Sequence, residues 1–294
     1  MLEVIDVPVG LDDIGGLEAL KAWLQQRREA FLPRAREYGL PVPKGLLILG
    51  VPGTGKSLTA KATASVFGIP LLKSDAGKLF GSLVGQSEAN LRLAIQTSEA
   101  IAPCVLWIDE LEKGFGGMGG GGNTDGGTSA RVFGSLLSWL QEKTTPVFVV
   151  ATANDISQLP PELLRKGRWD ELWFVDLPNS RERTAIWDIV IEKYGRERTD
   201  FDTVVLARAS EMHTGAEIES AFVEALHRAF CDGNGPREPT ELDRGEVLNE
   251  MVPLATTMSE AIERLRHWAK GRARHATHAA SDRPSNGKRK LDLS

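Results

Sequence analysis

The chain has 294 residues, which is enough for one large domain or two modest ones at roughly 150 residues per domain. With 41% hydrophobic and 26% charged residues it has the composition of an ordinary globular protein, and a net charge of −5 argues against a nucleic-acid partner. Two cysteines are too few for a disulfide framework or a zinc cluster, and no run of about 18 apolar residues could cross a membrane, so we expect no membrane partner.

The first half of the chain alternates between helical and strand patterns. A helix is expected over residues 17–38, where Leu17, Leu20 and Leu24 recur at helical spacing and Gly39 follows. Continuous apolar runs of strand length, separated by helical patterns, predict a parallel sheet covered on both faces. The expected strands are residues 46–49, 70–72, 105–108, 147–150 and 172–175, and the expected helices between them are residues 56–67, 88–100 and 128–141.

Beyond residue 178 the strand pattern stops, and this change predicts a second domain. Helical patterns follow at residues 181–194, 204–208, 216–230 and 259–270. From Gly271 the sequence turns polar and basic, which is typical of a disordered end. We therefore predict an α/β domain at residues 1–178, a helical domain at residues 179–270 and a disordered basic tail at residues 271–294.

Glycine is concentrated in one short segment. Nine of the 30 glycines lie between Gly114 and Gly127, a density that predicts a mobile stretch of chain. The segment is either a flexible linker before the next helix or a loop that contacts a substrate. Composition alone leaves both interpretations open.

Residues 50–57, with the sequence GVPGTGKS, fit the phosphate-binding pattern G-x-x-x-x-G-K-[ST] between an expected strand and an expected helix. Glycines let backbone N–H groups turn toward phosphate oxygens, and the following helix adds the positive end of its dipole. Lys56 is expected to pair with the β- and γ-phosphates, and the Ser57 hydroxyl to bind Mg²⁺. The residues expected to surround the nucleotide here are Pro52, Gly53, Thr54, Gly55, Lys56, Ser57 and Leu58.

Two carboxylates follow the apolar run at residues 105–108. A buried strand that ends in aspartate is typical of a Walker B site, so Asp109 is expected to hold the hydrated Mg²⁺. Glu110 is then expected to act as the general base on the attacking water. The pattern is weak alone, and its place about fifty residues after a phosphate loop gives it weight.

With these motifs the chain resembles the AAA family of ATPases over residues 11–270. Residues 12–16 resemble the entry motif against the adenine, residues 163–170 the second region of homology, and residues 214–217 the lid motif beside the adenine. The resemblance implies an α/β parallel-sheet P-loop AAA domain followed by a small all-α lid, which binds ATP and Mg²⁺ in a ring, as a homo-hexamer. The residues that it adds to the site are Asp13, Ile14, Gly15, Gly215 and Ala216 at the adenine, Asn154 as the sensor that aligns the water, and Arg165 and Arg168 as fingers toward the neighbouring subunit.

A narrower likeness is to the AAA ATPases of chloroplast open reading frames and cyanobacteria. It rests on residues 38–45, 101–110 and 251–255. This likeness implies a location in the cytoplasm, or in the plastid stroma for a plastid-encoded chain. Such relatives often carry an extra amino-terminal domain, which this chain is expected to lack or to have lost.

The implied function is ATP hydrolysis that remodels a protein substrate, reached directly or through an adaptor; neither is identified by the sequence. The triplet at the first pore-loop position is Leu83-Val84-Gly85, where polypeptide-threading relatives carry an aromatic residue. Leucine offers a smaller apolar contact to an extended chain. The alternative is therefore an ATP-dependent regulatory or scaffold protein with little turnover. A DNA-remodelling ATPase is a third option, which the acidic balance disfavours.

Overall fold

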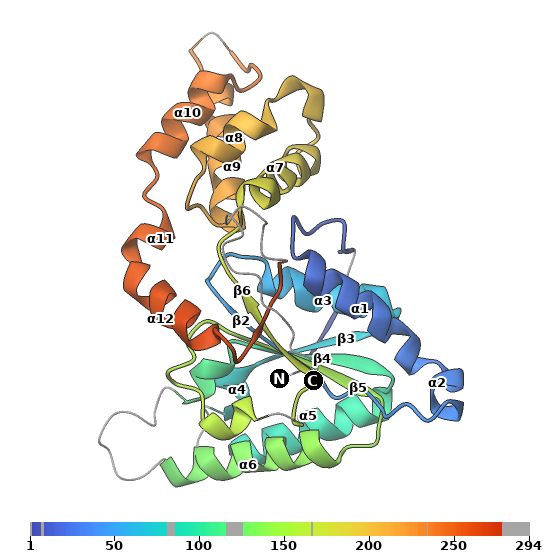
Figure 1. The fold of residues 1–294 in the computed structure, drawn as a ribbon. Helices are drawn as coiled ribbons and strands as arrows, with labels where there is room; N and C mark the ends of the chain where they lie inside the picture. Colours follow the sequence, from blue (N-terminus) through green and yellow to red (C-terminus); the bar gives the residue numbers. More distant parts are fainter. Residues whose placement is uncertain are drawn as a thin grey trace, which may run out of the picture.

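A computed structural model describes residues 2–6, 9–80, 86–115, 126–165, 167–233 and 235–277. Its centre is a seven-stranded sheet with the order β1-β3-β4-β5-β2-β6-β7 (Figure 1). Neighbouring strands are parallel except at one edge, where β1 pairs antiparallel with β3. The strands are β1 (Glu3–Ile5), β2 (Gly45–Gly50), β3 (Leu71–Asp75), β4 (Cys104–Asp109), β5 (Val147–Ala153), β6 (Glu171–Val175) and β7 (Arg274–His275). The expected α/β class is confirmed, and the carboxyl ends of β4, β5 and β2 lie side by side.

Helices cover both faces of the sheet (Figure 1). One face packs against α1 (Glu18–Arg28) and α3 (Lys56–Phe67), and the other against α4 (Ala76–Phe80), α5 (Gln86–Ile101) and α6 (Gly126–Glu142). Successive strand residues point to opposite faces, so Leu46 and Ile48 join the first core and Leu47 and Leu49 the second. All four are fully buried, which explains why the strands are apolar without alternation.

A helical part follows β6. It consists of α7 (Ser180–Lys193), η4 (Arg198–Asp200), α8 (Thr203–Ala209), α9 (Gly215–Phe230) and α10 (Glu241–Glu250), which share a separate core around Trp187 and Phe222. Two further helices, α11 (Leu254–Thr257) and α12 (Ser259–Ala269), lead back to the sheet (Figure 1). Leu265 of α12 packs against Phe174 of β6, although the predicted helical domain of residues 179–270 includes this helix.

The helix expected over residues 17–38 is broken into three pieces. Helix α1 ends at Arg28, a 3-10 turn η1 (Glu29–Phe31) follows, and α2 covers Pro33–Glu37. Leu32 is extended, because the ring of the following proline disfavours helical backbone at the residue before it. Pro33 therefore starts a new helix at its first position.

The prediction of a disordered chain from Gly271 onward is wrong for residues 271–277. β7 pairs in parallel with β6, and the Ala276 N–H donates to the Phe174 carbonyl. The Ala276 carbonyl in turn accepts the N–H groups of Ala19 and Leu20. Helix α1 has no side-chain cap of its own, so this carbonyl satisfies donors that the helix leaves open.

Three sequence predictions lie outside the described residues. They concern the triplet Leu83-Val84-Gly85, residues 116–125 of the glycine-rich segment, and the basic tail at residues 278–294. Among the residues that are described, no helix is long and apolar enough to cross a bilayer.

Candidate active site

The phosphate-binding loop joins the end of β2 to the start of α3. Gly53 (φ +78°) and Gly55 (φ +93°) lie in the left-handed region, which glycine adopts without the cost that a Cβ atom brings. A Cβ on Gly53 would lie 2.8 Å from the Thr214 hydroxyl oxygen. Its absence lets the start of α9 approach, and the Ala216 N–H donates to the Gly53 carbonyl at 3.1 Å. The loop is thus in direct contact with the helical part.

Lys56 is buried inside this loop. Its ammonium nitrogen donates to the Gly50 carbonyl at 2.8 Å and to the Val51 carbonyl at 2.6 Å, and the residue is 6% exposed. Burial lowers the pKa of Lys56 to about 8, and nearby carboxylates only partly oppose this shift. The loop therefore holds a cationic group at the place where the phosphates of a nucleotide are expected.

The carboxyl end of β4 presents the two predicted carboxylates. Asp109 accepts the Thr152 hydroxyl at 2.6 Å through Oδ1, and its Oδ2 lies 3.3 Å from the Lys73 ammonium. The same ammonium lies 4.3 Å from the centroid of the Trp107 ring, within the range of a cation–π contact. Hydroxyl and ammonium together fix the orientation of the Asp109 carboxylate.

Glu110 has an unusual backbone conformation for a residue with a side chain. Its φ is +53°, in the left-handed region, which costs a residue other than glycine about 1–2 kcal/mol. The Glu110 N–H donates to the Thr152 hydroxyl at 3.3 Å, so one threonine contacts both carboxylate residues. The side-chain oxygen Oε2 lies 2.5 Å from the Lys113 ammonium.

A third acidic residue lies behind the first two. Glu112, on the 3-10 turn η2 (Leu111–Phe115), is 6% exposed, and its Oε1 accepts the Asn154 N–H at 3.0 Å. Its Oε2 has no hydrogen-bond partner among the described residues. Burial raises the pKa of Glu112, and the hydrogen bonds with Asn154 only partly offset this effect. Glu112 thereby ties the predicted sensor asparagine to the turn after β4.

These elements line one cavity of about 790 Å³, within the usual range for small-molecule sites. The phosphate loop, both carboxylates and Asn154 give it a polar lining, and Ile186, Ile189 and Val190 of α7 add apolar side chains. Every predicted nucleotide-binding residue lines the cavity: Asp13, Ile14, Gly15, Pro52, Gly53, Thr54, Gly55, Lys56, Ser57, Leu58, Gly215 and Ala216.

Arg165 and Arg168 line a different cavity of about 440 Å³, together with Lys44 and Gln141. Neither arginine is among the described residues that line the first cavity. Arg168 also donates to the backbone carbonyl of Glu162. One copy of the chain therefore does not bring these arginines to its own phosphate loop.

The oxygen donors at the phosphate end suit a magnesium ion. Ser57 offers a hydroxyl and Asp109 a carboxylate, and both line the same cavity. Mg²⁺ typically takes one or two protein oxygens and completes its shell with water and substrate phosphates. Among the described residues, no cluster of three or more histidine, cysteine, aspartate or glutamate side chains could hold a metal ion.

Sequence reasoning missed four polar residues that surround the predicted ones. Thr152 is a buried threonine in an otherwise apolar strand, and that anomaly could have marked it. Lys73 directly follows the apolar pair Leu71-Leu72 on β3. Glu112 and Lys113 lie two and three residues after Glu110, and after the left-handed turn at Glu110 their side chains contact Asn154 and Glu110.

The sequence profile described as "ATPase family associated with various cellular activities (AAA)" matches residues 46–177. A Guillardia theta protein named "Uncharacterized AAA domain-containing protein ycf46" is 50% identical over 270 residues, which are 92% of this chain and 52% of that protein. Proteins of the same name from Pyropia yezoensis and Trieres chinensis are 51% and 46% identical, over 90% and 94% of this chain and 53% and 55% of theirs. The chain thus spans about half the length of the curated relatives it matches.

Proposed function

Because the chain belongs to the AAA family of ATPases, we propose that it binds ATP with Mg²⁺ in the cavity between the sheet and the helical part, and hydrolyses it. The observation that carries the proposal is the convergence of Lys56, Asp109, Glu110 and Asn154 on one cavity. Asp109 ends β4, and Glu110 and Asn154 directly follow β4 and β5. Lys56 follows β2 through the phosphate loop, so all four residues lie beyond the carboxyl ends of three neighbouring strands, where α/β proteins place their ligands.

Different residues of the cavity would bind the adenine, the phosphates and the Mg²⁺ ion. The adenine would lie between Asp13, Ile14 and Gly15 on one side and Gly215 and Ala216 on the other. The phosphates would accept the N–H groups of the glycine loop and pair with Lys56. Ser57 would bind Mg²⁺ directly and Asp109 through water, and the bound ion would supply positive charge to the phosphate oxygens.

Hydrolysis needs a base, an aligned water and charge neutralisation. Glu110 would take a proton from the water as its oxygen attacks the γ-phosphorus, and the bond to the β-phosphate oxygen would break to give ADP and phosphate. Asn154 would align the water. Lys56, with Arg165 and Arg168 of a neighbouring copy, would stabilise the developing charge. The reaction would then take place at a subunit interface of a ring, a homo-hexamer. We propose that this ring works in the cytoplasm or in a plastid stroma.

Replacing Glu110 tests the proposal. Glu110→Gln keeps the size and most hydrogen bonds of the side chain but removes the base, so ATP binding should persist while turnover falls by about 100-fold or more. Nucleotide binding would be measured by calorimetry and turnover by phosphate release. Normal hydrolysis by this variant would show that Glu110 is not the base.

The energy of ATP hydrolysis would serve to remodel another protein. Movement of the helical part relative to the sheet would remodel a protein substrate, reached directly or through an adaptor. Leu83, in place of a pore-loop aromatic residue, favours the second candidate, an ATP-dependent scaffold with little turnover. Turnover measured in rings of verified size decides between them, because a scaffold should bind ATP there and scarcely hydrolyse it.

A further inference from the structure

The carboxylate proposed as the base is engaged by a lysine three residues away. The Lys113 ammonium lies 2.5 Å from Glu110 Oε2, and the Lys113 N–H donates to the Glu110 carbonyl at 2.9 Å. Both contacts belong to one tight turn, which begins at the left-handed residue Glu110. The pairing is therefore built into the chain immediately after β4.

Lys113 pairs with the Glu110 carboxylate from outside the nucleotide cavity. Glu110 lines that cavity, whereas Lys113 is not among the described residues that do. The Lys113 side chain is 57% exposed and that of Glu110 is 35% exposed, so water screens their attraction. An exposed pair of this kind is weak enough to be broken when a ligand rearranges the site.

The turn that carries the lysine is firmly anchored. η2 packs on α4, where the Phe80 ring lies so close to Gly114 that a Cβ there would come within 2.6 Å of it. On the same turn the buried Glu112 accepts the Asn154 N–H. The backbone of Lys113 is thus fixed relative to β4 and β5, and only its side chain has room to move.

We propose that Lys113 is a positioning residue that restrains the Glu110 carboxylate and thereby lowers the basal rate of ATP hydrolysis. The inference rests on the proposed function, since it needs Glu110 to act as the base. Lys113 occupies one of the two oxygens and holds the side chain toward the rim of the cavity. Release of this contact frees the carboxylate to meet the attacking water.

The test compares Lys113→Ala, Lys113→Gln and Lys113→Arg in the full chain with ATP and Mg²⁺. Loss of the ammonium should raise kcat about two- to fivefold, the range expected when an exposed ion pair is broken, with KM unchanged. Lys113→Arg keeps the charge and should retain the wild-type kcat. Arg264→Ala removes an exposed pair with Glu260 on α12 and serves as the control for general effects of lost surface charge.

Each outcome has one meaning. An unchanged or lower kcat in Lys113→Ala overturns the inference, as does a gain that persists in the double variant Lys113→Ala, Glu110→Gln. A merely structural role for the lysine would change KM and stability together and would not be rescued by arginine. Wild-type turnover in Glu110→Gln alone refutes the proposed base instead, and a chain that binds no ATP refutes the proposed function altogether.

Discussion

The phosphate side of the cavity and the junction between the sheet and the helical part are held together in different ways. On the phosphate side, Lys56 bonds to carbonyls five and six residues away, and Glu110 pairs with Lys113 three residues on. At the junction, the carboxylate of Glu182 joins segments that are far apart in the chain. It accepts the N–H of Leu17, the N–H of Asn179 and the hydroxyl of Thr277.

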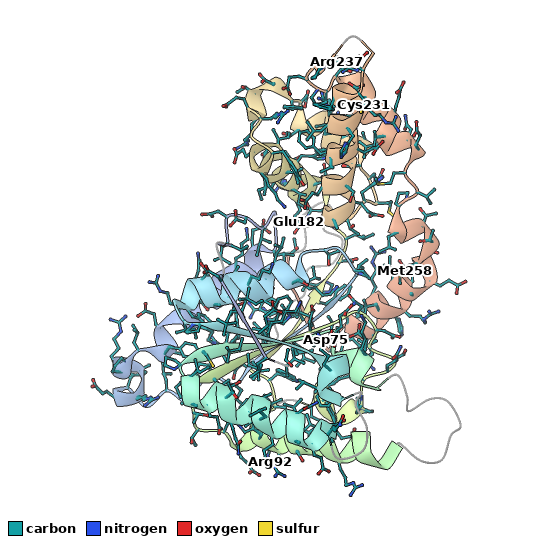
Figure 2. The ribbon with its side chains drawn as sticks, turned by 180° about the vertical axis from the view of Figure 1, so that it is seen from behind. Asp75, Arg92, Glu182, Cys231, Arg237 and Met258 are labelled. Atoms are coloured by element: carbon teal, nitrogen blue, oxygen red, sulfur yellow. The ribbon has the colours of Figure 1, made fainter. Side chains whose placement is uncertain are left out.

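Glu182 lies where the helical part meets the sheet (Figure 2). It starts α7 through a capping box with Asn179, and it is 6% exposed. The contacts of Lys56 and Glu110 thus arrange groups within the site, whereas those of Glu182 join the helical part to Leu17 and Thr277. Changes at Lys56 and Glu110 should therefore mainly alter binding and turnover, and a change at Glu182 should mainly alter stability.

The largest effect is expected from Glu182→Ala. It leaves the buried N–H of Leu17 and the N–H of Asn179 without their acceptor, and each such loss costs about 1–3 kcal/mol. The free energy of unfolding, measured by urea denaturation, should fall by about 3 kcal/mol. Glu260→Ala, at a side chain that is 91% exposed, is the control and should scarcely change it. Equal free energies of unfolding for the two variants would show that Glu182 does not hold these segments together.

A smaller effect on stability is expected at Glu112. Two substitutions there separate the contribution of the charge from that of the hydrogen bond. Burial raises the pKa of Glu112, so the folded state binds its proton more tightly and loses stability as the pH rises through that pKa. Glu112→Gln keeps an acceptor for the Asn154 N–H without the charge and should be at least as stable as wild type at pH 7. Glu112→Ala removes the acceptor and should cost about 1–2 kcal/mol.

Thermal unfolding and steady-state turnover together check the Glu112 prediction. Glu112→Ala should also lower kcat, because Asn154 loses the contact that fixes its backbone. A glutamine variant less stable than the alanine variant would contradict this account.

The smallest effect concerns the pH dependence of ATP affinity. Since the pKa of Lys56 is about 8 in the free protein and bound phosphates would raise it, binding takes up a proton above that pH. The affinity should therefore fall about threefold between pH 7.5 and 8.5, where the charge of ATP itself changes little. Calorimetric titration at several pH values measures this slope.

Lys56→Arg is the matched variant for the pH effect. Its guanidinium stays charged throughout this range, so its affinity, although altered by the larger group, should not depend on pH. A wild-type affinity that stays constant from pH 7.5 to 8.5 would contradict the assignment of Lys56 to the phosphates.

The same contrast explains what the sequence could predict. The phosphate loop, Asp109, Glu110 and Asn154 are contiguous motifs at strand ends, and the parallel sheet alone brings those ends together. Asn179 and Glu182 carry the local signal of a capping box, but nothing nearby in the sequence indicates the contact between Glu182 and Thr277, which are about 100 residues apart. β7 was missed for a related reason. Two residues within a basic, polar run become a strand only because β6 offers them an open edge.

The return of α12 and β7 to the sheet limits how the helical part can move. The chain leaves the sheet beside Glu182 and comes back near Met258, and these two places lie well apart (Figure 2). Ala255 and Ile262 pack there against Val51 of the phosphate loop, so the second attachment is a packed one. Two separated attachments leave rotation about the line that joins them as the least restricted movement. We therefore expect any movement of the helical part relative to the sheet to follow that axis.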